Sequence, residues 1–278
     1  MQSLSSLLEH PGLLARKAVG RLRRRLMKVP RGSVVQLING TVRFEFQWQP
    51  FLADEDQRAM FTRSYDLILC DCLRKHLSPG DIVLDVGANV GYVSAVAASY
   101  IGTTGAVHGF EPLRMCFDRL QVLSALNPQF HFVFNNIAVG DEEGVLPISY
   151  DPKGESRNAT LVPGQKCVVT EGVPVKRLDD YIRSKISSPE RIKLIKIDVE
   201  GFEFRVLRGL ERFLAESHRP LIVCEIKPWE IEKLGFSIGS FERYMKSFGY
   251  DSYDMVSQSK RIDLARLTDI EVVLFKAC

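Results

Sequence analysis

The stretch IVLDVGANVGY, residues 82–92, decides the fold. An apolar run of strand length ends in an acid, passes through a turn with two glycines and continues into a helical pattern. Gly87 and Gly91 allow a sharp backbone turn without a Cβ in the way of a ligand, and the amide groups of the helix start face outward. This order predicts a nucleotide site at the carboxyl end of a buried strand.

Two details of this loop restrict which kind of nucleotide it can bind. The glycine spacing is GxxxG, and Asn89 stands where the dinucleotide fingerprint has its second glycine. Asp85 lies directly before the loop, where its carboxylate would repel a pyrophosphate. The loop therefore favours a ligand with a cationic end.

The chain after residue 80 alternates short apolar runs with helical patterns, which is typical of a parallel sheet covered by helices on both faces. The last two apolar runs, at 250–256 and 270–275, have no room for a crossover helix between them, so they should pair antiparallel. We therefore predict an α/β fold. The expected strands are 81–86, 106–111, 131–137, 192–198 and 220–226, and the expected helices are 91–102, 112–126, 202–216 and 240–248.

The N-terminal part divides into a basic arm, residues 1–32, and an extension, residues 33–78, before a main domain at 79–278. The arm has eight basic residues and one acid, a charge of +7 that leaves −4 for the rest of the chain's +3. Leucines at near-helical spacing predict an amphipathic helix over 3–28, interrupted near Pro11. Such a helix suits an anionic membrane or an acidic partner, but a mobile arm or a helix packed on its own domain remains open.

The extension should contain a hairpin around Asn39-Gly40, flanked by alternating residues at 34–48, and a helix over 55–77. Residues 141–174 are rich in Gly, Pro, Ser and Asn, and a connection of this length inside a domain is typical of a substrate loop.

The composition excludes several classes of protein. With 45% hydrophobic and 26% charged residues, the chain has enough apolar side chains for a core and is not of disordered composition. No apolar run approaches the ~20 residues of a membrane-spanning helix. The six cysteines form no CxxC pair, which indicates reduced thiols and a cytoplasmic location, with peripheral membrane contact through the arm as an option.

Two further strand ends carry polar groups toward the same sheet edge. Glu111 follows Gly87 by 24 residues and can accept hydrogen bonds from both hydroxyls of a ribose. Asn136 and Ile137 close the next strand, where a side-chain amide and a backbone N–H suit the edge of an adenine.

The stretch IKIDVEGFE, residues 195–203, closes the fourth expected strand. Lys196, Asp198 and Glu200 share one face because a strand has a two-residue period. Charges in that position are costly in a purely structural strand, so we expect them at the sheet edge where a substrate would lie.

These strand ends resemble the S-adenosylmethionine site of Rossmann-like class I methyltransferases. Together with Phe110-Glu-Pro112, Arg177-Leu-Asp-Asp-Tyr181 and Val223-Cys-Glu225, the sequence resembles the FkbM family of methyltransferases over residues 60–256, weakly at 141–172. The resemblance implies a mostly parallel seven-stranded sheet, S-adenosylmethionine as cofactor, and a hydroxyl of a sugar, glycan or natural product as acceptor. The expected cofactor-binding residues are Asp85, Gly87, Asn89, Gly91, Glu111, Asn136 and Ile137.

Methyl transfer to a hydroxyl requires an in-line oxygen and a group that takes its proton. Asp198 and Glu200 are the leading candidates for that base, with Glu225 at the next strand end as a third; Asp198 alternatively contacts the cofactor's amino group. Such carboxylates also suit Mg²⁺, but a metal is not favoured because no further well-spaced Asp/Asn pair follows.

Two other functions stay open at this stage. The basic arm suits an RNA acceptor, although acids at the acceptor site would repel phosphate, so nucleic acid is disfavoured. A non-catalytic module that only binds the cofactor is the second alternative.

Overall fold

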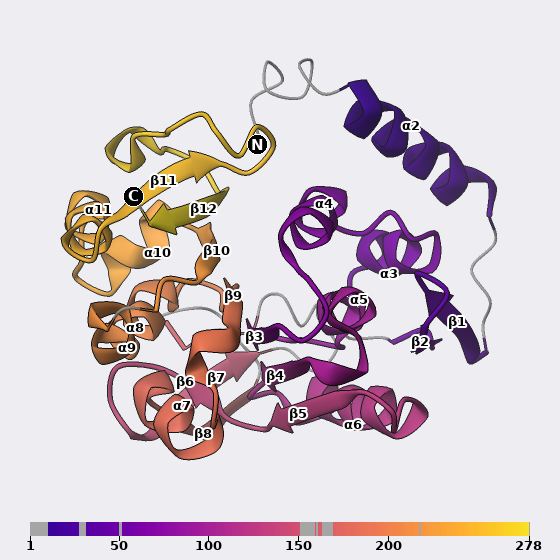
Figure 1. The fold of residues 1–278 in the computed structure, drawn as a ribbon, viewed down its shortest axis with the longest axis horizontal. Helices are drawn as coiled ribbons and strands as arrows, with labels where there is room; N and C mark the ends of the chain where they lie inside the picture. Colours follow the sequence, from indigo (N-terminus) through magenta and orange to yellow (C-terminus); the bar gives the residue numbers. More distant parts are fainter. Residues whose placement is uncertain are drawn as a thin grey trace.

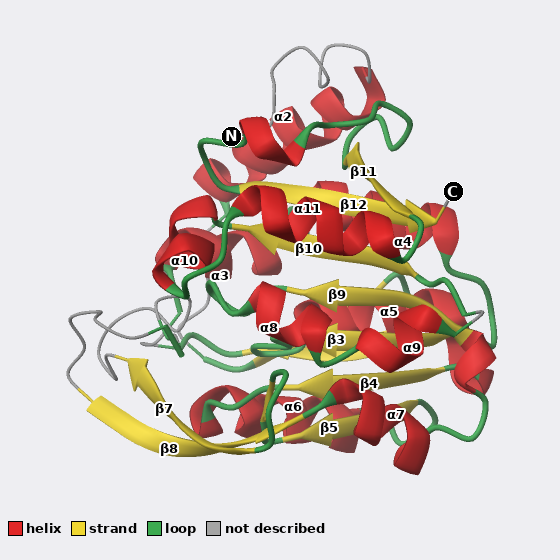
Figure 2. Ribbon diagram, turned by 90° about the vertical axis from the view of Figure 1, so that its left-hand side faces the viewer, coloured by secondary structure: helices red, strands yellow, loops and turns green. Residues whose placement is uncertain are grey.

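A computed structural model describes residues 11–27, 32–49, 52–150, 159, 161–162, 169–216 and 218–277 of the protein. Its centre is a seven-stranded sheet of order β11-β12-β10-β9-β3-β4-β5 (Figures 1 and 2). The strands from β10 to β5 run parallel, and β12 runs antiparallel to both of its neighbours. The predicted fold class is confirmed. The strands are β3 (Ile82–Val86), β4 (Ala106–Phe110), β5 (His131–Asn135), β9 (Ile192–Ile197), β10 (Leu221–Ile226), β11 (Tyr250–Asp254) and β12 (Glu271–Ala277).

Helices cover both faces of this sheet (Figure 1). Successive strand residues enter opposite hydrophobic layers: Val83 packs in one core cluster and Leu84 in the other. Two buried faces explain why the central strands β3, β9 and β10 are mainly apolar rather than alternating. One face carries α4 (Leu67–His76), α5 (Tyr92–Ile101) and α6 (Arg114–Leu126); the other carries α7 (Leu178–Lys185), α8 (Glu203–Arg208), α9 (Glu211–Ala215), α10 (Pro228–Lys233) and α11 (Ile238–Ser247).

The N-terminal extension packs on the first of these faces. The predicted hairpin is present as β1 (Val34–Ile38) and β2 (Val42–Phe46), with Asn39 and Gly40 at positive φ in the turn. The predicted helix over 55–77 is wrong as a single element, because α3 (Asp54–Phe61) ends before α4 begins. Asp66 separates them: it adopts φ 36° and accepts the Leu69 N–H on its carboxylate at 3.1 Å as the N-cap of α4.

Two other segments differ from the sequence prediction. The predicted loop at 141–174 contains β7 (Gly144–Tyr150) and β8 (Val169–Lys176), which pair antiparallel and form a three-stranded sheet with β6 (Ala138–Val139). The expected helix over 202–216 is divided into α8 and α9 at Gly209, where a Cβ would lie 2.2 Å from the Gly140 carbonyl oxygen. Part of the predicted loop, at 151–158, 160 and 163–168, lies outside the described residues.

The basic arm forms α2 (Pro11–Leu26), whose first residue is the proline at which we expected an interruption. Residues 3–10 of the predicted helix lie outside the described part of the chain. Among the helices of the described residues, none has the length and apolar character needed to cross a bilayer.

Candidate active site

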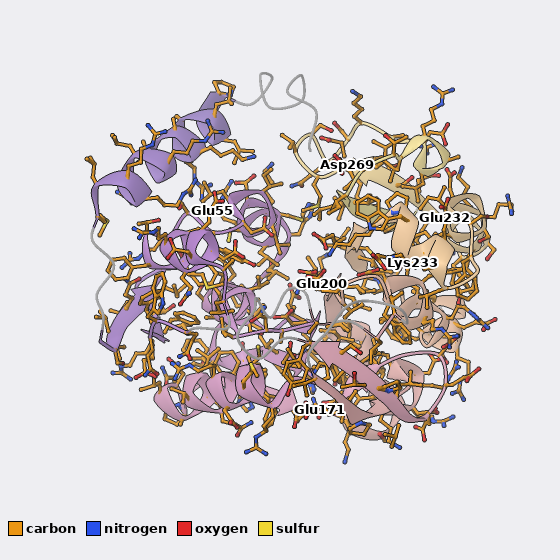
Figure 3. The ribbon with its side chains drawn as sticks, turned by 180° about the vertical axis from the view of Figure 1, so that it is seen from behind. Glu55, Glu171, Glu200, Glu232, Lys233 and Asp269 are labelled. Atoms are coloured by element: carbon orange, nitrogen blue, oxygen red, sulfur yellow. The ribbon has the colours of Figure 1, made fainter. Side chains whose placement is uncertain are left out.

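A cleft of about 290 Å³ opens at the carboxyl ends of the parallel strands. Its floor comes from the loop after β3 and from the ends of β4 and β9, and its outer wall comes from α3 and the α3–α4 turn. Glu200, which lines it, lies near the middle of the molecule in Figure 3. A crevice at this edge of an open α/β sheet is where such folds bind ligands.

The two glycines of the β3–α5 loop are required by close packing against other parts of the protein. Gly87 adopts φ 78°, and a Cβ there would lie 1.8 Å from the carbonyl oxygen of Asp198. Gly91 adopts φ 84°, and its Cβ would lie 2.7 Å from the Leu120 side chain on α6. Gly87 lines the cleft, whereas Gly91 lies outside its described lining and packs against α6; the ligand contact predicted for Gly91 stays a prediction.

Asp85 lies beneath this loop and not in the cleft. Its side chain is completely buried, accepts the Ser94 hydroxyl at 2.6 Å and lies 3.4 Å from the Lys196 ammonium. Lys196 in turn donates to the Gly87 carbonyl oxygen at 2.6 Å. This carboxylate holds Lys196 and Lys196 holds the loop, so Asp85 supports the cleft from below, and the cofactor contact predicted for it stays a prediction.

Glu111 has the position expected of a ribose-binding acid. Its two carboxylate oxygens accept the backbone N–H groups of Asn89 at 2.8 Å and Leu113 at 2.9 Å, and it lines the cleft. Each carboxylate oxygen can accept a second hydrogen bond, so this fixed carboxylate keeps acceptor capacity for a ligand. Burial raises the pKa of Glu111 to about 7, even though the two N–H groups stabilise its charged form.

One of the two residues predicted at the end of β5 lines the cleft. Ile137 lines the cleft, as does the Asn89 of the opposite loop. The Asn136 amide instead donates to the backbone carbonyls of Glu111 and Pro112, both at 2.9 Å. The side chain thereby ties the end of β5 to the end of β4, and its predicted contact with adenine stays a prediction.

Three acids meet where β9 and β10 end. Asp198, Glu200 and Glu225 each have a carboxylate oxygen within 4.8 Å of the others. Burial, and after it the negative charge of Asp198, raise the pKa of both Glu200 and Glu225. The sequence prediction brought these three residues to one sheet edge, and the structure places them together.

Lysines accompany this acid cluster. Lys227 contacts Glu200 and lies 2.9 Å from Glu225, while Lys196 lies 3.4 Å from Asp198. We did not anticipate Lys227, although it follows Glu225 by two residues and so belongs to the same strand face. The three carboxylates have the spacing of cation ligands, and the Lys227 ammonium already places one positive charge between two of them.

The extension supplies a further charged wall. Asp56 of α3, together with Tyr65 and Asp66 of the α3–α4 turn, lines the cleft. Burial raises the pKa of Asp66. No motif in the sequence links these residues to strands that follow much later in the chain, and only the packing of the extension reveals them. Of the described residues that line the cleft, six are acids and one is a lysine, and Lys227 lies beside two of the acids; the lining acids are Asp56, Asp66, Glu111, Asp198, Glu200 and Glu225, and the lining lysine is Lys196.

The sheet order, the glycine loop and the acid at the end of β4 define a Rossmann-like methyltransferase fold. The family model of the methyltransferase FkbM domain matches residues 85–252, which include every element around the cleft except the extension. The chain belongs to the FkbM methyltransferase family.

Relatives from several organisms are similar to this chain. Methyltransferase sdnD of Sordaria araneosa is 29% identical over 56% of this chain and 69% of its own length. The 31-O-demethyl-FK506 methyltransferase FkbM of Streptomyces tacrolimicus is 31% identical over 50% of this chain and 64% of its own. The hexuronic acid methyltransferase AglP of Haloferax volcanii is 26% identical over 55% and 61%. The match therefore spans less than two thirds of the last two relatives.

Among solved structures, the methyltransferase FkbM of Methylobacillus flagellatus KT superposes with a TM-score of 0.44 at 14% identity, over 81% of this chain and 56% of that one.

Proposed function

We propose that this protein is an S-adenosylmethionine-dependent O-methyltransferase whose acceptor is a hydroxyl group of a sugar or of a glycosylated small molecule. The observation that carries the proposal is the cluster of Asp198, Glu200 and Glu225 in the same cleft as Glu111. Two relatives support the acceptor class, since one is named for hexuronic acid and another for a demethyl natural product.

The residues around the cleft fit this cofactor. Glu111 would accept the two ribose hydroxyls, and Ile137 would pack against the adenine. The excess of acids suits a ligand with an ammonium and a sulfonium charge. The bound cofactor supplies an electrophilic methyl carbon, so the protein must orient the acceptor oxygen and remove its proton.

We assign the proton-accepting role to Asp198. Its side chain is 39% exposed, whereas those of Glu200 and Glu225 are 24% exposed and share Lys227. A base must reach the hydroxyl of the acceptor, and the most accessible carboxylate of the cluster meets that need. Glu200 and Glu225, held by Lys227, would orient the neighbouring hydroxyls of the acceptor.

The first test is calorimetric titration of the folded protein with S-adenosylmethionine. We expect binding by the wild type and weaker binding by Glu111→Gln. Absence of binding by the wild type would contradict the proposed cofactor.

The second test is a mass-spectrometric screen of sugars, glycolipids and hydroxylated metabolites for the gain of one methyl group. With an acceptor found, Asp198→Asn should reduce kcat by about 100-fold or more while the cofactor affinity changes little. Asp118→Asn is the matched control, because Asp118 is an exposed acid on α6 paired with Arg114. A turnover number unchanged by Asp198→Asn would refute the assigned role.

A further inference from the structure

Helix α2 has one side fixed against the protein body. Gly20 is the buried residue of this helix, and a Cβ there would lie 2.6 Å from the Cβ of Ser64. Arg24, one turn later on the same side, donates to the Ser64 hydroxyl at 2.6 Å. Leu13 packs against the core cluster. These contacts with the segment around α3 and α4 determine which side of α2 faces outward.

The opposite side of α2 is apolar. With 100° between successive residues, the side facing away from Gly20 carries the apolar stripe: Ala15, Ala18, Val19, Leu22 and Leu26. Val19, Leu22 and Leu26 are 50%, 56% and 73% exposed. An amphipathic helix of a globular protein normally buries such a stripe against its own core. In α2 the stripe is exposed to solvent instead, and the helix itself lies at the outer edge of the molecule (Figure 1).

Arginines lie along both edges of the apolar stripe. By the same helical spacing, Arg21 and Arg25 lie on one edge. Arg23 lies beyond the other edge, next to Arg16, whose guanidinium is 3.5 Å from the Asp71 carboxylate of α4. Residues 11–26 contain no acid. The exposed surface of α2 is therefore an apolar band between two rows of positive charge.

We propose that α2 is an in-plane membrane-binding helix that docks the protein on an anionic lipid surface. The apolar stripe would enter the boundary between headgroups and acyl chains, and the arginines on both edges would reach lipid phosphates with their guanidinium groups. The positive charge of α2 is complementary to an anionic lipid surface. Because a lipid surface is flat on the scale of one helix, the arginines on both edges of the stripe can contact it at once.

The apolar stripe distinguishes a lipid surface from a nucleic acid. Arginines alone would suffice to neutralise the phosphates of RNA, and exposed leucines between them would gain nothing from that contact. A lipid surface uses both features, since burial of the leucine side chains adds to the attraction of the charges.

The test is co-sedimentation of the full chain with vesicles of phosphatidylglycerol and phosphatidylcholine, compared with vesicles of phosphatidylcholine alone. We expect binding to the anionic vesicles that weakens as salt is raised. Leu22→Gln with Leu26→Gln should weaken it by about tenfold or more. Arg21→Gln with Arg25→Gln should weaken it by about tenfold as well.

Matched controls are available on other surfaces of the protein. Val145 of β7 is an exposed apolar residue and Arg266 an exposed arginine, so Val145→Gln and Arg266→Gln should bind like the wild type. The variants alter exposed positions, and thermal unfolding checks that they remain folded. The proposal is overturned if the wild type ignores anionic vesicles, if the leucine variants bind undiminished, or if α2 instead confers salt-dependent retention on RNA without vesicle binding.

Discussion

Lys196→Met tests whether a buried lysine holds the floor of the cleft together. Lys196 is 5% exposed, and its ammonium lies 3.4 Å from both Asp85 and Asp198. Burial lowers the pKa of this lysine, but the charges of Asp198 and Asp85 outweigh that effect and the net shift is upward. The ammonium is therefore charged at neutral pH, and methionine would remove the charge while keeping a side chain of similar length.

The expected loss of unfolding free energy follows from the carboxylate that Lys196→Met leaves buried without its lysine. Asp85 would stay completely buried with the Ser94 hydroxyl as the only partner among those described. Removing one member of a buried ion pair costs about 3–5 kcal/mol of unfolding free energy. For a chain of 278 residues that corresponds to a fall in Tm of roughly 5–9 °C. Asp85→Asn combined with Lys196→Met also removes the unpaired buried carboxylate. We therefore expect the double variant to regain at least half of the unfolding free energy that Lys196→Met loses.

Urea unfolding of the two single variants and the double variant gives the coupling energy between Lys196 and Asp85. Lys246→Met is the control, because Lys246 is an exposed lysine paired with Glu242 and should contribute about 1 kcal/mol or less. The reasoning is refuted if Lys196→Met costs no more than the control, or if the effects of Lys196→Met and Asp85→Asn simply add.

Three further predictions concern the glycines and the pH dependence. Gly87→Ala should destabilise the fold by about 2 kcal/mol or more and lower turnover, because its Cβ meets the Asp198 backbone at a positive φ; thermal unfolding and kcat measure this. Gly91→Ala should cost less unfolding free energy than Gly87→Ala, since its Cβ meets only side-chain methyl groups that can shift; the reverse order would contradict the packing described. Burial raises the folded-state pKa of Glu203 and Glu111 to about 7, so the folded state binds more protons than the unfolded state and stability falls as pH rises from about 4.5 to 7. Glu203→Gln should reduce that slope by up to about 1.4 kcal/mol per pH unit in unfolding titrations, and an unchanged slope would exclude Glu203 as a source.

The sheet could be predicted from the sequence because its central strands β3, β9 and β10 are mainly apolar on both faces and its parallel strands alternate with helical patterns. Two features of the fold could not be predicted: one depends on the conformation of a single residue, and the other on the pairing of strands that are far apart in the sequence. The break before α4 depends on Asp66 adopting positive φ, which a non-glycine residue does only at some cost. The pairing of β7 with β8 joins two segments separated by residues without clear periodicity.

The acid cluster could be predicted because carboxyl ends of neighbouring parallel strands meet at one edge. The burial of Asp85 beneath the loop follows from the two-residue period of a strand. Residues at alternate positions of β3 share a face, so Asp85 lies on the side of Val83, which packs in the cluster of α5. Its carboxylate therefore points under the helix toward Ser94 and not over the edge of the sheet.

The burial of Asp85 gives that residue a different purpose in the proposed reaction. If Asp198 accepts a proton from the acceptor hydroxyl, Lys196 loses one of its two carboxylate partners at that moment. The ammonium is still held by Asp85 and by the Gly87 carbonyl oxygen, so it need not move or seek a new partner in the cleft. Asp198 would change its charge during turnover, so its neighbour Lys196 must be held in place by other groups. The buried ion pair with Asp85 holds Lys196 in this way.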